Sequence, residues 1–125
     1  MKKAIRRLPD TEQEVMCALW ACEPPATRAE IESILFQTHP MAMTPLLTML
    51  TRLSKKGFLT IRKEGRKGYY TPCITQEEYF ASQGRNFIEK LCGGNLSVFA
   101  NALCDSGLSK EELKELRTLL ERNEP

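Results

Sequence analysis

The sequence lacks any apolar run close to the ~18 residues that a helix needs to cross a bilayer. Its basic first seven residues, MKKAIRR, are not followed by the apolar stretch of a secretory signal peptide. Hydrophobic residues make up 42% of the chain and charged residues 27%, which is typical of a soluble globular protein. We therefore expect a cytoplasmic protein that does not insert directly into a membrane.

A disulfide or zinc-binding pattern is also missing. The five cysteines are odd in number and scattered, and none forms a Cys-x-x-Cys pair. We interpret them as ordinary reduced thiols: Cys17, Cys22, Cys73, Cys92 and Cys104. A thiol or metal sensor is the alternative interpretation, for which Cys17 and Cys22 are the only near pair.

The sequence contains no set of residues that suggests catalysis. His39 is the only histidine and has no second metal ligand or base at a useful spacing. There is no Ser/His/Asp set and no phosphate-binding glycine loop. The single tryptophan, Trp20, lies late in an amphipathic segment and is expected in the core. We expect no enzymatic activity, no metal and no cofactor.

Charge is distributed unevenly along the 125 residues. Residues 1–73 carry twelve Lys and Arg against seven Asp and Glu, a net of +5, whereas residues 74–125 carry six against nine, a net of −3. A basic half beside an acidic half is expected when only one of them faces a polyanion. The length allows a compact domain of about 70 residues with an appendage. We therefore predict two domains, residues 1–73 and residues 74–125.

Two helix starts follow each other in the basic half. Asp10 or Thr11 can cap a first helix, whose apolar residues repeat at helical spacing until Pro24-Pro25 ends it. Thr27 and Glu30 have the spacing of a capping box and predict a second, shorter helix.

A third start, Thr44-Pro45, combines a cap residue with proline at the first helical position. This helix is expected to run to Lys56 and to stop at Gly57. Leu46, Leu50 and Leu53 line its inner face, so its outer face is polar and cationic. The residues turned outward by this spacing are Thr48, Thr51, Arg52 and Lys55.

After the third helix the apolar period changes to two, which predicts two short strands around a basic turn at residues 65–68. Three helices followed by a hairpin with a cationic tip is the element order of a winged helix-turn-helix. Between Thr44 and Tyr69, seven Lys and Arg face a single acid, Glu64. We therefore predict a mainly α fold with a small β-hairpin wing, and a DNA-binding surface on the third helix and the wing tip. The residues predicted to contact DNA are Thr44, Leu47, Thr48, Thr51, Arg52, Lys55, Lys56, Arg66 and Lys67.

The pattern of residues 74–125, the acidic half, predicts helices and no sheet. Residues 75–78 and Ser109 can each cap a helix, and Gly93-Gly94 breaks the first of them. About 50 residues of helix make a poor core alone, yet their apolar side chains are too many to leave in water. A second copy of this arm would cover them and give a two-fold dimer that matches a palindromic operator. The residues predicted at the dimer contact are Tyr79, Phe80, Phe87, Leu91, Phe99, Leu103, Leu116 and Leu120.

Several segments, in this order and spacing, resemble the BlaI/MecI family of penicillinase repressors. The longest are residues 8–16 (LPDTEQEVM), 26–31 (ATRAEI), 48–59 (TMLTRLSKKGFL) and 108–116 (LSKEELKEL). Shorter matches are Leu19-Trp20, residues 63–66, residues 70–72 and Gly93-Gly94. The resemblance covers nearly the whole chain.

The resemblance implies a dimeric transcriptional repressor of genes for antibiotic resistance or envelope stress. It also implies a second partner besides operator DNA: a membrane sensor whose metalloprotease domain leads to a cut in the repressor's arm. The matching bond in this chain is Asn101-Ala102. Ala102 stands where the best-known members of the family have phenylalanine.

The start of the third helix departs from the family pattern. The family usually has a tryptophan and a Thr-Val pair there, whereas this chain has Met41, Pro45 and Leu46, with the apolar Leu47 where a polar residue is common. We expect base specificity to differ accordingly. These residues also leave open an alternative function, a winged-helix module that binds protein, because they could form an apolar patch in place of a base-reading surface.

Overall fold

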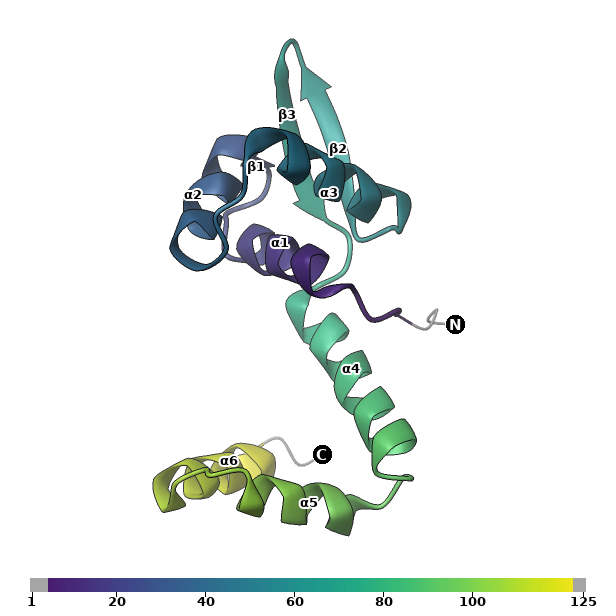
Figure 1. Ribbon diagram of the computed structural model, residues 1–125, viewed down its shortest axis with the longest axis vertical. Helices are drawn as coiled ribbons and strands as arrows, with labels where there is room; N and C mark the ends of the chain where they lie inside the picture. The colour runs from purple at the N-terminus through teal and green to yellow at the C-terminus, as the bar shows by residue number, and fades with distance from the viewer. Residues whose placement is uncertain (1–4, 123–125) are drawn as a thin grey trace. The chain divides into compact units, whose positions relative to one another are not determined.

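The computed structural model describes residues 5–122 and is mainly helical, with one small antiparallel sheet (Figure 1). The predicted fold class is confirmed. The elements in chain order are α1 (Asp10–Trp20), β1 (Ala26–Thr27), α2 (Arg28–Thr38), α3 (Met43–Lys55), β2 (Leu59–Glu64), β3 (Lys67–Pro72), α4 (Gln76–Leu91), α5 (Leu96–Asp105) and α6 (Lys110–Arg122). None of the described helices is both long and apolar enough to span a membrane.

The first three helices and the sheet share one hydrophobic core. Each helix contributes its apolar face, and β2 and β3 contribute their inward residues. The fully buried side chains include Val15, Met16, Leu19, Ile31, Leu35, Leu46, Leu50, Leu53 and Leu59. Trp20 packs against this core and donates its indole N–H to the carbonyl oxygen of Ile74 at 2.9 Å, as expected of a partly buried tryptophan.

The sheet has the strand order β1-β3-β2. β2 and β3 pair from Leu59 with Pro72 to Glu64 with Lys67, which leaves a two-residue turn, Gly65-Arg66. Gly65 adopts φ +62°, a conformation that glycine enters without steric cost. The hairpin was predicted, but the two-residue strand β1, which pairs with β3, was not.

Three of the predicted helix caps are confirmed, at the starts of α2, α4 and α6. The capping box of Thr27 and Glu30 is present at the start of α2. The Thr75 hydroxyl accepts the Glu78 N–H, and the Ser109 hydroxyl accepts the Glu112 N–H, so these two predicted starts also carry side-chain caps. α3 ends in the expected left-handed glycine, Gly57, with φ +83°.

Two predicted caps are wrong. α1 begins directly at Asp10, and its cap position is Pro9, which supplies no side-chain hydrogen bond. α3 begins at Met43 after Ala42, so Thr44 already has helical geometry and cannot cap the helix from outside. Pro45 still falls within the first turn, where a missing N–H removes no intrahelical bond.

The chain divides into two compact units, one ending at Gln83 and the other beginning at Gly84. This division lies ten residues beyond the boundary predicted at 73/74. The first turns of α4 belong to the N-terminal unit because Tyr79, on that helix, is fully buried in its core. The C-terminal unit contains the rest of α4 together with α5 and α6, and none of its described side chains is fully buried.

Candidate nucleic-acid interface

The inner face of α3 is anchored in the core. Leu46, Leu50 and Leu53 have no exposed surface, and they repeat at the spacing that places side chains on one face of a helix. After the helix, the Phe58 N–H donates to the Leu53 carbonyl at 2.9 Å and the Gly57 N–H donates to the Ser54 carbonyl at 3.0 Å, which terminates α3 by a Schellman motif. α3 is therefore fixed in orientation and presents its opposite face to solvent.

That opposite face is the outer face of α3, defined by six side chains around a shallow hollow. They are Thr44, Leu47, Thr48, Thr51, Arg52 and Lys55. All six residues are exposed, and all six were predicted to contact DNA. Among residues 5–122, no ion pair engages Arg52 or Lys55. The outer face thus combines methyl-bearing side chains with two cations that are available to an external anion.

Two hydroxyls on the outer face are already hydrogen-bonded to the helix. Thr48 Oγ1 donates to the Thr44 carbonyl at 3.0 Å, and Thr51 Oγ1 donates to the Leu47 carbonyl at 2.9 Å. A threonine hydroxyl has a single hydrogen, so in this state these side chains can only accept a further hydrogen bond.

Lys56 was predicted to contact DNA, but its ammonium group has a partner inside the protein. Its Nζ lies 2.7 Å from Oε2 of Glu12, a carboxylate whose side chain is 3% exposed. Lys56 is the cap residue after α3 and does not line the hollow. This pair could not be predicted from the sequence, because Glu12 lies in the first turn of α1, where an acidic residue is usually exposed to solvent.

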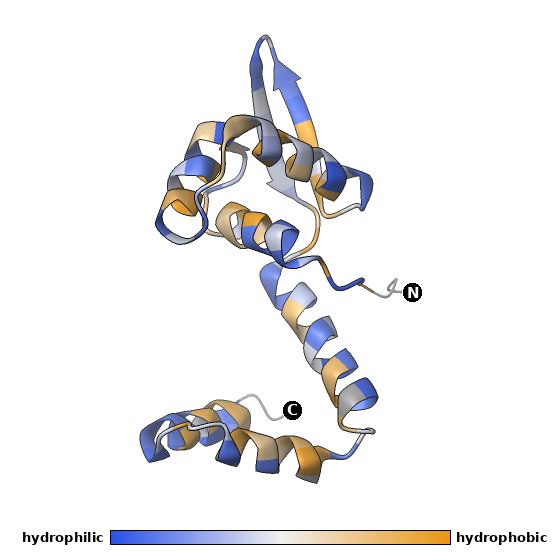
Figure 2. Ribbon diagram, viewed as in Figure 1, coloured by the Kyte–Doolittle hydropathy of each residue, from blue (hydrophilic) through white to orange (hydrophobic). Residues whose placement is uncertain are grey.

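The hairpin tip forms a second cationic surface. Arg66 and Lys67 are exposed, and within the described part of the chain neither takes part in an ion pair. Figure 2 shows the far end of the hairpin as hydrophilic, beyond the helices of this unit. Behind the tip, the guanidinium of Arg62 lies 5.1 Å from the centre of the Tyr69 ring. This cation–π contact engages Arg62 within the hairpin and leaves the two tip residues to face solvent.

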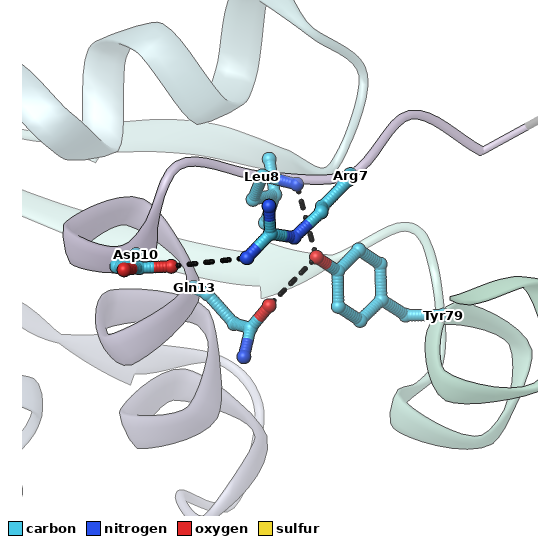
Figure 3. A network of polar contacts seen from close by, with 5 residues as sticks. All are labelled: Arg7, Leu8, Asp10, Gln13 and Tyr79. Atoms are coloured by element: carbon cyan, nitrogen blue, oxygen red, sulfur yellow. Dashed lines mark hydrogen bonds and ion pairs between the residues drawn. The ribbon is translucent and has the colours of Figure 1, made fainter. Parts of the chain in front are cut away.

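Tyr79 has a structural role in the N-terminal unit and cannot belong to the predicted dimer contact. Its hydroxyl accepts the Leu8 N–H at 3.0 Å and donates to Gln13 Oε1 at 2.9 Å (Figure 3). Its ring lies 5.7 Å from that of Trp20 and 5.8 Å from that of Phe58. The apolar spacing along α4 identified Tyr79 as a residue that must be covered, but the core of its own chain covers it.

The other predicted dimer residues have varied exposure. Phe80 and Phe87 are 42% and 43% exposed, and Leu120 is 64% exposed. Phe99, Leu103 and Leu116 are half-buried, and the Phe99 ring lies 5.8 Å from that of Phe87. The side chain of Leu91 lies outside the described residues. Asn101 and Ala102, the predicted cleavage position, are both exposed on α5.

The cysteines do not form a metal site. Within residues 5–122, no three His, Cys, Asp or Glu side chains are grouped so that they could hold a metal ion. Burial, with a smaller contribution from Glu14, raises the pKa of the Cys17 thiol, and burial together with Glu30 raises the pKa of Cys22. Both shifts disfavour the thiolate, which is the form that reacts and binds metals. The sensor alternative therefore gains no support from this pair.

Known proteins resemble this chain over most of its length. The family model described as penicillinase repressor matches residues 8–122. The penicillinase repressor of Bacillus licheniformis is 36% identical over 122 residues, which cover 97% of this chain and 94% of the relative. The methicillin resistance regulatory protein MecI of Staphylococcus aureus is 31% identical over 112 residues, 89% of this chain and 90% of the relative.

Solved structures match the N-terminal part. The solution structure of the DNA-binding domain of the repressor BlaI is 38% identical and superposes with a TM-score of 0.51, covering 63% of this chain and 94% of the solved one. The Bacillus licheniformis BlaI monomeric form in complex with the blaP half-operator matches with the same coverage and a TM-score of 0.50. The family match, its curated relatives and the shared fold lead to one conclusion: the chain belongs to the penicillinase repressor family of transcriptional repressors.

Proposed function

We propose that this repressor binds a palindromic operator as a homodimer, with α3 in the major groove and the hairpin tip on phosphates or in the minor groove. The observation that carries the proposal is the outer face of α3, where the exposed Arg52 and Lys55 follow a row of three threonines and Leu47 on a helix fixed by the core. A helix of this kind fits the major groove, and cations without internal partners can neutralise phosphates.

The solved BlaI complex supports this mode of binding. That complex contains a monomeric form with a half-operator, so one copy of that relative engages half of a site. One copy of this chain is then expected to read one half-site, and two copies joined by the arm would read both halves of a palindrome. Regulation of antibiotic-resistance genes is the role that the names of the relatives suggest.

The C-terminal unit supports dimerisation. Its apolar side chains remain in contact with solvent, since Leu96 is 67% exposed and Leu120 is 64% exposed. Figure 2 shows apolar positions distributed along α5 and α6. A unit without a buried core of its own gains stability by pairing with a second copy, because contact removes apolar surface from water. We therefore propose that the dimer contact lies in the unit that begins at Gly84.

Induction is proposed to proceed by cleavage between Asn101 and Ala102. Both residues are exposed, but the bond lies inside α5, which Asn95 caps by accepting the N–H groups of Ser97 and Val98. A protease that binds extended chain would need α5 to open locally first. Mass spectrometry of the chain recovered from induced cells should find fragments ending at Asn101 and beginning at Ala102, whereas intact chain during full induction would contradict this step.

The experiment that tests operator binding is fluorescence anisotropy of the full chain against the duplex upstream of its own gene, with a scrambled duplex as control. We expect tight binding that prefers the upstream duplex and weakens steeply with salt, with a slope of about −0.9 in log K against log salt for each neutralised phosphate. Weak binding that is indifferent to both sequence and salt would favour the protein-binding alternative. That alternative has lost part of its basis, because Leu46 is fully buried and cannot join a surface patch.

A further inference from the structure

The half of the outer face nearest the start of α3 has no side-chain amide, ammonium or guanidinium group. Thr44, Leu47, Thr48 and Thr51 occupy this half, and the side-chain N–H groups of Arg52 and Lys55 lie beyond it. The hydroxyl hydrogens of Thr48 and Thr51 are used within the helix. To a base edge, this half therefore offers methyl groups and oxygen lone pairs, and the Thr44 hydroxyl is its one side-chain donor without a hydrogen bond among the described residues.

Base pairs differ in what they require from a protein in the major groove. Guanine is read by two donors from Arg or Lys, and adenine by the donor and acceptor of an Asn or Gln amide. Thymine is the base that presents a methyl group, and an apolar side chain contacts it favourably. The first turns of α3 lack the groups for the first two contacts but have the group for the third.

We propose that Leu47 reads the methyl group of a thymine in each half of the operator. This inference rests on the proposed function and specifies one base contact within it. Leu47 is 38% exposed and lines the hollow together with three threonines, so part of its apolar side chain is open to contact with a methyl group. The neighbouring cations, Arg52 and Lys55, attract a polyanion to the same face, which makes DNA the occupant that fits.

Met43 provides a matched control on the same helix. It is 51% exposed and precedes Leu47 by one helical turn, but it does not line the hollow. Removing its side chain changes the exposed apolar surface of α3 without changing the hollow. The variants M43A and L47A therefore separate a general apolar effect from a contact made by Leu47.

The test begins with selection of a preferred site from a random duplex library by the full chain. Each thymine of that site is then replaced singly by uracil, which pairs identically and lacks only the methyl group. We expect one position per half-site at which uracil weakens binding about fourfold, the value of one buried methyl group. In L47A the thymine and uracil duplexes should bind equally, whereas M43A and the apolar replacement L47M should keep the difference.

The outcomes separate this inference from the proposed function. Failure to select any site, with salt-insensitive binding, would overturn operator binding itself. A selected site at which every uracil replacement is neutral would leave operator binding intact and overturn the thymine contact. A thymine–uracil difference that persists in L47A, or disappears in M43A, would assign the contact to another residue, provided that the unfolding transitions of the variants match the wild type.

Discussion

Lys56 Nζ lies 2.7 Å from Oε2 of Glu12 and joins the end of α3 to the first turn of α1. The Glu12 side chain is 3% exposed, and its second oxygen, Oε1, has no hydrogen-bond partner among the described residues. A buried carboxylate is costly unless it is paired. The pair therefore ties the end of α3 to α1, and Lys56 has an internal partner that the adjacent Lys55 lacks among the described residues.

The variant K56M should destabilise the N-terminal unit. Removing one partner of a buried pair leaves an uncompensated charge, and because Lys56 is itself 41% exposed we expect a loss of about 1–2 kcal/mol in the free energy of unfolding. Urea unfolding followed by the fluorescence of Trp20, the single tryptophan, measures it. The control K55M should lose at most about 0.5 kcal/mol while weakening DNA binding. Equal losses of stability in the two variants would contradict the assigned roles.

The variant Y79F, which changes no charge, should also lower the free energy of unfolding. Y79F keeps the ring contacts but leaves the buried Leu8 N–H without its acceptor and Gln13 without its donor. We expect a loss of about 1–3 kcal/mol in the free energy of unfolding. Thermal unfolding of Y79F should be compared with Y69F, since the Tyr69 hydroxyl has no hydrogen bond within residues 5–122. An unchanged midpoint in Y79F would show that water replaces the lost partner.

Local signals in the sequence predicted most of the helix and hairpin positions. The capping box at Thr27 and the glycine at position 57 act through neighbours a few residues away, so their effect can be read from a short window. The hairpin could be predicted for the same reason, because a change of apolar period and a glycine turn are local features.

The missed features all depend on partners distant in the sequence. β1 is two residues long and exists because Ala26 pairs with Tyr70. The ion pair of Lys56 was not predicted because its partner, Glu12, lies 44 positions earlier. The spacing of Tyr79 showed that it must be buried but not that its own core would bury it. Periodicity identifies an apolar face, and only the tertiary fold determines what covers that face.

The cysteines should differ in reactivity. Burial raises the pKa of both Cys17 and Cys22, so at a given pH a smaller fraction of each is thiolate than in a free cysteine, while Cys73 is exposed. Cys104 is exposed as well, so we expect Cys73 and Cys104 to be alkylated by iodoacetamide before Cys17 and Cys22 in the native protein. Cys17 and Cys22 should remain slower even when the pH is raised to the pKa of a free thiol. Mass spectrometry of timed samples measures the order. Faster alkylation of Cys22 than of Cys73 would contradict it and restore the thiol-sensor alternative.

The hairpin tip should contribute affinity without sequence preference. The double variant R66A/K67A removes two cations that can contact phosphates, so it should weaken binding to operator and scrambled duplexes by similar factors and reduce the salt slope by about 1–2. T48A, on the outer face of α3, should instead relax discrimination at one base position. Anisotropy titrations over a salt series measure both effects, with R85A in the C-terminal unit as a control. A loss confined to the operator duplex would mean that the tip reads bases.

Leu120 tests where the two copies meet. It is 64% exposed on α6, on the same helical stripe as Leu113 and Leu116. L120E places a charge in the proposed contact and should convert the dimer to monomers in sedimentation velocity, because a buried unpaired charge opposes association. T118E adds the same charge on the other side of α6 and should leave the dimer intact. Trp20 lies in the N-terminal unit, so unchanged Trp20 fluorescence in L120E would show that this unit remains folded. A dimer that persists in L120E would place the contact on another surface of the arm.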